Sequence, residues 1–151
     1  MVQIKHGDLL LSKEDFIVHQ CNTTSKGASG LAYTIFMECP ESNTYDGEYA
    51  ELRKVGTVSS TFSVINLYGQ RHPGRANNTD DTATMRLKWF KQGLFAISKN
   101  RDIESLAFPY LIGSSLAGGK WDNYLNALLA FDEYLIEQGR EIDIVIYKLE
   151  K

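Results

Sequence analysis

The most constraining feature of the chain is an apolar strand that runs directly into a loop of small residues. The run Phe16-Ile-Val-His-Gln-Cys-Asn22 ends in polar residues, and Gly27-Ala-Ser-Gly-Leu-Ala32 follows it at the start of an expected helix. Small residues let a backbone approach phosphate groups closely at a helix N-terminus. A second such loop, Ile112-Gly-Ser-Ser-Leu-Ala-Gly-Gly119, repeats the arrangement late in the chain. Two loops of this kind predict one cleft for a diphosphate.

The order of the expected elements indicates the fold class. Apolar patterns predict strands over 2–5, 16–21, 55–60, 61–68, 105–109 and 142–149. Helical patterns are found over 29–37, 82–99 and 121–138, and a single helical turn is expected over 49–52. Strands and helices alternate, which predicts an α/β fold with a largely parallel sheet and helices on both faces. Ligands bind such sheets beyond the carboxyl ends of the strands, where both small-residue loops lie.

Composition is that of one globular domain over residues 1–151. The chain has 43% hydrophobic and 23% charged residues, enough to bury a core without disulfides or metal. Its formal net charge of -3 argues against a dedicated nucleic-acid binder, which usually carries a basic surplus. Arg71, His72 and Arg75 form a local basic cluster, which we interpret as a solvated loop rather than a nucleic-acid contact.

The two cysteines and the hydropathy of the chain indicate the cellular compartment in which we expect the protein. Cys21 and Cys39 lack metal-ligand spacing and are expected to be reduced thiols of a cytoplasmic protein. The N-terminal residues 1–5 lack a signal-peptide pattern, and no apolar run is long enough to cross a bilayer. We therefore expect a cytoplasmic monomer that needs no metal, cofactor or membrane.

Neither loop matches a nucleotide-binding pattern by its spacing, since G-x-G-x-x-G and G-x-x-x-x-G-K-[ST] are both absent. Each loop alone fits a plain turn as well as a phosphate contact, but two at strand ends favour an anionic ligand. Alternate strand residues share a face, so His19 and Cys21 point the same way. His19 and Asn22 either edge the cleft, or they are a hydrogen-bonded core histidine and a turn residue. Cys21 lies too near His19 in sequence to indicate a nucleophile pair.

Two aspartates lie at the starts of expected turns or helices. Asp8 either caps a turn or accepts a hydrogen bond from an exocyclic amine such as that of adenine. Asp122 follows Gly118-Gly119 and is interpreted as favouring a helix N-terminus through the helix dipole. Trp89 and Phe90 fit the core stripe of a helix rather than a base-stacking surface.

Taken together, these motifs resemble a macrodomain. The matching pieces span nearly the whole chain in the right order: Gly7-Asp8-Leu9, Ile17-Val-His-Gln-Cys-Asn22, Gly27-Ala-Ser-Gly-Leu-Ala32, and the segment from Phe108 to Gly119. The most similar branch is the ADP-ribose 1″-phosphate phosphatases, in which a strand His-x-Cys-Asn replaces the Asn-Ala-Ala-Asn of most macrodomains. Ile65-Asn-Leu-Tyr-Gly-Gln70 and Gly118-Gly119-Lys120-Trp121 also look like this branch.

The resemblance implies a three-layer α/β/α fold around a mixed, mostly parallel sheet, and it implies roles for matching residues. Asp8 would accept from the adenine amino group, the Leu9 backbone would contact the ring, and Tyr147 would pack beside it. Asn22 would hold the distal ribose, and His19 would be the candidate catalytic residue. Backbone around the phosphates would come from Ser29, Gly30 and Leu31 on one side and from Ser114, Ser115, Leu116, Ala117 and Gly118 on the other.

The chain departs from the family pattern in both loops. Ala28-Ser29-Gly30 stands where the family usually has three glycines, so side chains narrow the approach to the phosphates. Ser115 replaces a usual glycine, and Ala117 replaces an aromatic that normally covers the distal ribose, which leaves the pocket more open. Lys120 stands where many relatives carry an acidic residue; it either faces solvent or attracts a terminal phosphate.

Three functions follow from the resemblance. The first is a phosphomonoesterase that converts ADP-ribose 1″-phosphate to ADP-ribose, with His19 acting on a water or on the leaving oxygen and Asn22 fixing the distal ribose. The second is a hydrolase that removes ADP-ribose from proteins or nucleic acid, or that deacetylates O-acetyl-ADP-ribose. The third is a module that binds ADP-ribose without turnover.

Overall fold

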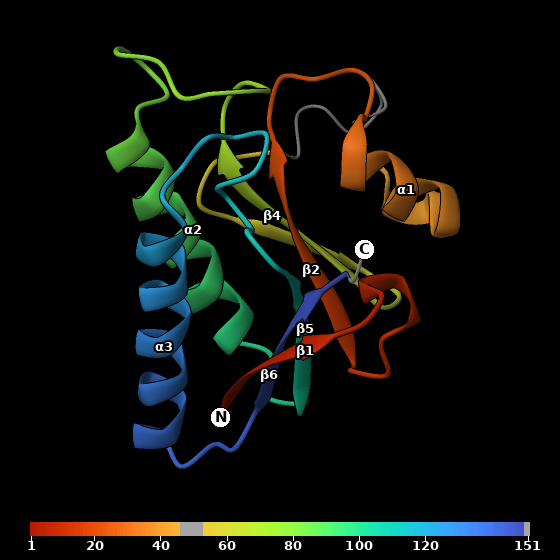
Figure 1. Ribbon diagram of the computed structural model, residues 1–151, viewed down its shortest axis with the longest axis vertical. Coiled ribbons are helices and arrows are strands. Elements are labelled where there is room, and N and C mark those ends of the chain that lie inside the picture. Colours follow the sequence, from red (N-terminus) through yellow and green to blue (C-terminus); the bar gives the residue numbers. More distant parts are fainter. Residues whose placement is uncertain (46–52, 150–151) are drawn as a thin grey trace.

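A computed structural model describes residues 1–45 and 53–149 as one sheet with helices on both faces (Figure 1). This confirms the predicted three-layer α/β/α architecture. The described elements are β1 (Val2–His6), η1 (Leu9–Leu11), β2 (Phe16–Asn22), α1 (Gly30–Glu38), η2 (Pro40–Ser42), β3 (Val58–Thr61), β4 (Val64–Gln70), α2 (Ala83–Ser98), β5 (Ser105–Pro109), α3 (Trp121–Glu137) and β6 (Asp143–Lys148). The helical turn expected over 49–52 lies outside the described residues.

The sheet is mixed and mostly parallel, as predicted. Its six strands lie in the order β1-β6-β5-β2-β4-β3, and every neighbouring pair is parallel except β3 with β4. The carboxyl ends of the five parallel strands therefore meet at one edge of the sheet. Three neighbouring strands end there in Asn22, Gln70 and Pro109. This edge carries the candidate site.

Strand β2 supplies side chains to both faces of the sheet. Val18 packs in the larger core with Phe90 of α2 and Leu128 of α3. Cys21 points to the opposite face and packs with Phe36 of α1. Figure 1 shows α2 and α3 together on one side of the sheet and α1 on the other. Because successive residues of a strand point to opposite faces, β2 contributes side chains to the cores on both sides of the sheet.

The element boundaries differ from the predicted ones mainly around β3 and β4. The two strands form a hairpin whose turn includes Phe62, which is exposed and has a positive φ of 50°. The second of these strands continues past its predicted end at residue 68, because Gln70 pairs with Asn22 of β2. Helix α3 ends at Glu137, one residue before the predicted end, and Gly139 follows with a φ of 74° and donates its N–H to the Ile136 carbonyl, which closes the last turn.

Across the described residues, the longest apolar helical stretch falls short of what a membrane crossing requires.

Candidate functional site

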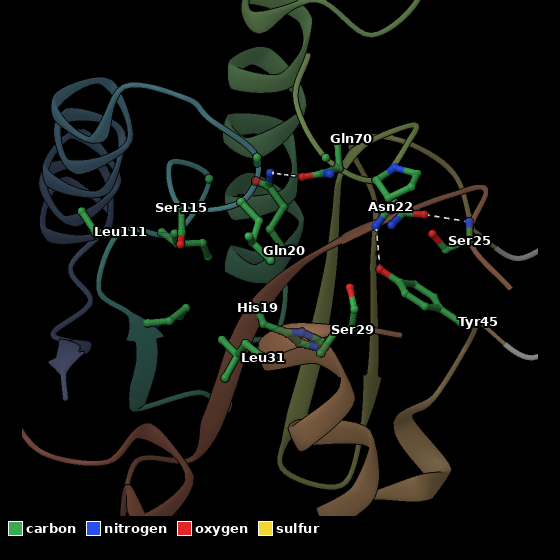
Figure 2. A pocket seen from close by; sticks show the side chains of 18 of the residues that line it. His19, Gln20, Asn22, Ser25, Ser29, Leu31, Tyr45, Gln70, Leu111 and Ser115 are labelled. Carbon is green, nitrogen blue, oxygen red and sulfur yellow. Dashed lines mark hydrogen bonds between the residues drawn. The ribbon is translucent and has the colours of Figure 1, made fainter. Parts of the chain in front are cut away.

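A cavity of about 330 Å³ lies at the carboxyl edge of the sheet, between the start of α1 and the loop after β5. Both small-residue loops contribute to its wall, so the structure brings them together as the sequence predicts. In Figure 2, Asn22, Ser25 and Tyr45 lie on one side of the cavity and Leu111 and Ser115 on the other. The lining residues are His19, Gln20, Asn22, Ser25, Gly27, Ser29, Leu31, Ala32, Tyr45, Gln70, Pro73, Gly74, Pro109, Tyr110, Leu111, Ile112, Gly113, Ser115, Leu116 and Ala117.

The first wall of the cavity is the N-terminus of α1. The first turn of a helix has N–H groups without intrahelical acceptors, and its dipole favours an anion. Ser29 is the N-cap residue, and its side chain makes no capping hydrogen bond; among the described residues, no loop or side-chain acceptor is found for these N–H groups. Gly30 has a φ of 59°, and a Cβ there would lie 3.3 Å from Leu116 Cδ1. The two loops are therefore in close contact across the mouth.

The second wall is the loop after β5, which is folded into tight turns. Ser114 donates its N–H to the Leu111 carbonyl, and Gly118 donates to the Ser115 carbonyl. Within the part of the chain that the structure describes, the N–H groups of Ser115, Leu116 and Ala117 find no acceptor. These three consecutive donors lie in a segment that lines the cavity. They provide a second set of preformed sites for an anionic oxygen.

Asn22 is oriented by the turn that follows β2. Its Oδ1 accepts from the N–H groups of Thr24, at 3.2 Å, and Ser25, at 2.8 Å, which fixes the amide orientation. Its own N–H donates to the Tyr45 hydroxyl at 2.9 Å. No acceptor for Asn22 Nδ2 is found among the described residues, and Asn22 lines the cavity. The structure thus presents a positioned amide donor that is free for a ligand.

His19 lies in the wall, but its ring is occupied by protein contacts. Its side chain is 1% exposed, and Nε2 lies 2.6 Å from Asn66 Oδ1. The ring also packs edge-on against Phe36, with 5.3 Å between centroids. Burial lowers the pKa of His19 from 6.5 to about 4, and the hydrogen bond that His19 donates to Asn66 opposes this shift. His19 is therefore neutral at pH 7, and its predicted catalytic role stays a prediction.

Three residues predicted for the adenine end lie outside the cavity wall but beside it. Tyr147 of β6 pairs in register with Pro109 and accepts the Tyr110 N–H at its carbonyl, at 2.9 Å. Asp8 caps η1 by accepting the Leu10 N–H at 2.9 Å. Leu9 is buried. The Tyr147 hydroxyl donates to Glu14. These residues continue the same sheet edge past the β5 end of the cavity.

The remaining residues singled out from the sequence lie outside the cavity wall. Cys21 is buried, and burial raises the pKa of its thiol well above the usual range, so the thiolate is disfavoured. Lys120 is the exposed N-cap residue of α3 and makes no capping hydrogen bond. In the basic cluster, Arg71 lies over the Trp89 ring, and His72 Nε2 lies 3.0 Å from Asp80 Oδ2. Ser114 and Gly118 use their N–H groups within the loop.

Several lining residues were missed by the sequence reasoning. Tyr45 comes from a polar segment without periodicity, yet its hydroxyl holds the Asn22 backbone. Gln20 donates to Gln70 at 2.7 Å, and Gln70 donates on to the His72 carbonyl at 2.9 Å. Gln20 lies near the end of the predicted strand 16–21, and Gln70 lies two residues after the predicted strand 61–68. Their positions near strand ends were the available signal. Tyr45 left no signal in the sequence.

The described part of the wall is almost free of ionisable side chains. Besides the neutral His19 and the phenols of Tyr45 and Tyr110, every described lining residue is apolar, a glycine, a serine or an amide. Burial raises the pKa of Tyr45 above its usual range, so its hydroxyl stays protonated. No group of three or more His, Cys, Asp or Glu side chains among the described residues is arranged to hold a metal ion. The donors that this wall offers to an anion are therefore backbone N–H groups, amides and hydroxyls.

Comparisons with known proteins identify the fold. No protein-family model and no curated protein matches the sequence. The solved macrodomain of Mycobacterium tuberculosis DarG superposes with a TM-score of 0.76 at 19% identity, covering 97% of each chain. That of Thermus aquaticus DarG gives 0.71 at 16% identity over 98% of each chain. Thermosipho africanus DarTG in complex with ADP-ribose gives 0.68 at 21% identity, covering 99% of this chain and 41% of the other. The chain has the macrodomain fold.

Proposed function

We propose that the cavity binds ADP-ribose or a close derivative and that the protein hydrolyses ADP-ribose 1″-phosphate to ADP-ribose and phosphate. The observation that carries the binding proposal is the convergence of two sets of free N–H groups on one cavity. The α1 N-terminus supplies one set, and Ser115, Leu116 and Ala117 supply the other. A diphosphate placed between them is held by dipoles from both sides. The DarTG structure of the same fold, named as a complex with ADP-ribose, supports this ligand class.

The sheet edge sets the direction of the ligand. Asn22 Nδ2 lies at one end of the cavity and suits the hydroxyls of the distal ribose, since it is a donor without a protein acceptor. Asp8 and Tyr147 lie beyond the β5 end and suit adenine, with a carboxylate for its amino group and a ring to pack beside it. The adenosine half therefore extends along the ends of β5, β6 and β1.

The phosphatase step transfers the phosphoryl group to water. A water oxygen bonds to phosphorus, the bond from phosphorus to the ribose oxygen breaks, and that oxygen takes a proton as ADP-ribose leaves. The backbone donors stabilise the charge on the phosphoryl oxygens, and Asn22 keeps the distal ribose in place. His19 Nε2 is engaged by Asn66 and the side chain is buried, so Nε2 reaches a reacting atom only if the ring leaves Asn66.

A binding module without turnover is the second candidate, and one observation favours it. No carboxylate, lysine, arginine or accessible histidine is found among the described residues of the wall. General acid–base catalysis needs such a group within hydrogen-bond reach of the reacting proton. A wall made of amides and backbone donors is suited to holding a ligand unchanged.

Two measurements test the proposal. Calorimetric titration with ADP-ribose, AMP and ribose 5-phosphate is expected to show the strongest binding for ADP-ribose, because only ADP-ribose reaches both ends of the cavity. Binding of all three with equal affinity, or of none, would exclude the proposed ligand. Phosphorus NMR of ADP-ribose 1″-phosphate incubated with the protein then follows release of inorganic phosphate.

Parallel incubations separate the possible reactions. ADP-ribosylated protein, ADP-ribosylated nucleic acid and O-acetyl-ADP-ribose are each incubated with the protein, and ADP-ribose release is measured by chromatography. Phosphate release alone supports the phosphatase. If ADP-ribose is released only from one of the other substrates, the protein is the corresponding hydrolase or deacetylase and the phosphatase proposal is wrong. Tight binding with no product from any substrate establishes the binding module.

A further inference from the structure

A buried ion pair lies behind the cavity, on the larger-core side of the sheet. Arg86 of α2 binds Asp81 through two hydrogen bonds, with Nε 2.9 Å from Oδ1 and Nη2 2.7 Å from Oδ2. The two side chains are 2% and 1% exposed. The carboxyl group keeps its charge there: burial raises its pKa, but the hydrogen bonds from Arg86 and two backbone N–H groups outweigh that effect and lower it. A buried pair with this geometry has both partners fully bonded.

The rest of the Arg86 guanidinium binds backbone carbonyls from two separate segments. Nη1 donates to the Gly74 carbonyl at 2.7 Å and to the Ala117 carbonyl at 3.4 Å. Nη2 donates to the carbonyls of His72, at 3.1 Å, and Arg75, at 3.3 Å. All five N–H groups of the guanidinium are thus used. One side chain holds the 72–75 segment and the loop after β5 against each other.

Both segments form cavity wall at the points where Arg86 holds them. Pro73 and Gly74 line the cavity on one side of this bond network, and Ala117 lines it on the other. The Ala117 carbonyl that accepts from Arg86 belongs to the same residue whose N–H is a free donor. Fixing the Ala117 backbone therefore also fixes the position of this donor in the cavity wall.

We propose that Arg86 is a positioning residue: it holds the Ser115–Ala117 donors in the geometry that a diphosphate requires. This inference rests on the proposed function and adds a named residue to it. Arg86 itself touches no ligand, because it is buried and absent from the cavity wall. Preorganised donors lose less entropy on binding than donors in a free loop, so losing Arg86 weakens the grip on the diphosphate.

The sharpest variant is Arg86→Lys. Lysine keeps a positive charge beside Asp81, but it carries three donors at one nitrogen and cannot reproduce a planar fork with five. Arg140→Lys is the matched control, because Arg140 also binds two backbone carbonyls, those of Ser98 and Asn100 at 2.6 and 2.9 Å. Those contacts lie at the C-terminal end of α2, whereas the cavity lies near its N-terminal end.

The experiment titrates wild type and both variants with ADP-ribose and with AMP. We expect Arg86→Lys to weaken ADP-ribose binding about tenfold and AMP binding less than threefold, because AMP lacks the diphosphate. Arg140→Lys is expected to bind both ligands like wild type. An equal loss for both ligands, or no loss, overturns the positioning role. Failure of wild type to bind ADP-ribose instead overturns the proposed function.

Hydrogen exchange adds a readout that does not depend on ligand. The Arg86→Lys variant is expected to exchange the amide hydrogens of Gly118 and Gly119, which are hydrogen-bonded within the loop, faster than wild type, with helix α3 unchanged; unchanged exchange at these amides also overturns the inference. If Arg86→Lys fails to fold, the double variant Asp81→Asn with Arg86→Gln removes both buried charges together and undergoes the same titrations, with the same expected and contrary results.

Discussion

His19 Nε2 and Asn66 Oδ1 lie 2.6 Å apart across the pairing of β2 and β4, where the two residues are register partners. Asn66 Nδ2 donates to the Ser42 carbonyl at 2.7 Å and to Ser59 Oγ at 3.1 Å. Its amide orientation is therefore settled, and its Oδ1 is the acceptor. It follows that His19 carries its proton on Nε2 and that Nδ1 is unprotonated at neutral pH.

The buried His19 gives the protein a defined loss of stability in acid. Its pKa falls from 6.5 to about 4 on folding, so between these values the unfolded chain binds a proton that the folded chain does not. Lowering the pH through this window therefore favours unfolding, by up to about 3 kcal/mol from this residue alone. Urea unfolding at a series of pH values measures the loss.

The variant His19→Gln isolates this contribution. Glutamine is neutral throughout, and its amide N–H replaces the donor to Asn66. We expect the free energy of unfolding of His19→Gln to fall less than that of wild type between pH 6.5 and pH 4. Parallel pH profiles for the two proteins would show that His19 titrates normally in the fold. The same variant reports on catalysis, since undiminished phosphate release would exclude His19 from the reaction.

Replacing Asn22 with Asp tests the distal ribose contact. The aspartate keeps an oxygen to accept from Thr24 and Ser25, so the turn is preserved. It removes the Nδ2 donor and places a negative charge near an anionic ligand. We expect ADP-ribose affinity to fall at least about tenfold, the equivalent of one lost hydrogen bond to a ligand hydroxyl. Calorimetric titration at pH 7 measures the change.

Asn100→Asp is the control for the Asn22 substitution. Asn100 Oδ1 accepts from the Asp102 N–H at 3.0 Å in the same kind of turn, but it lies at the end of α2, outside the cavity wall. ADP-ribose affinity is expected to match wild type. Equal affinities for wild type, Asn22→Asp and Asn100→Asp would remove Asn22 from the binding site.

The fold was predictable from sequence because its elements carry strong local patterns. Helix α2 runs from Ala83, one residue after the predicted start, because Thr82 caps it by accepting the Met85 N–H. The β3–β4 turn was harder to place, since Phe62 adopts a positive φ without the glycine that usually marks such a turn. Local sequence patterns therefore predict the positions of helices and strands well and those of irregular turns poorly.

The cavity was predictable only in part. Small residues mark the segments around Gly30 and Ala117, because close backbone approach demands them. Tyr45 and Arg86 were not found, since each acts through a residue distant in sequence. Arg86 sits in a helix among exposed charges, and only the tertiary structure shows that it is buried with Asp81. Contacts between residues distant in the sequence produce no periodic pattern from which they could be predicted.

The two cysteines are expected to differ in reactivity. Cys21 is 1% exposed and burial raises its thiol pKa, whereas Cys39 at the end of α1 is partly exposed. A colorimetric thiol reagent should label one thiol quickly in the native protein and two after unfolding in urea. Cys39→Ser should abolish the fast phase. Fast labelling of Cys39→Ser would show that Cys21 is accessible.

Gly113 is the residue at which the loop after β5 tolerates a side chain least. Its φ is 78°, and an added Cβ would lie 2.3 Å from Tyr124 Cε1. The Tyr124 ring cannot retreat, because it packs edge-on against Phe90 with 4.9 Å between centroids. Gly113→Ala therefore combines backbone strain with a clash in the core, and we expect a loss of about 3 kcal/mol in the free energy of unfolding.

The Gly113 substitution is also expected to displace the Ser115–Ala117 donors, since the Gly113 carbonyl accepts the Gly119 N–H at 3.1 Å and closes the loop. ADP-ribose binding should weaken together with stability. Gly27→Ala is the stability control, because a Cβ there meets nothing within 4 Å. Its unfolding free energy should stay close to wild type. A Gly113→Ala protein with wild-type stability in urea would show that the loop and the Tyr124 ring adjust freely, and that the donors are not held rigidly for the ligand.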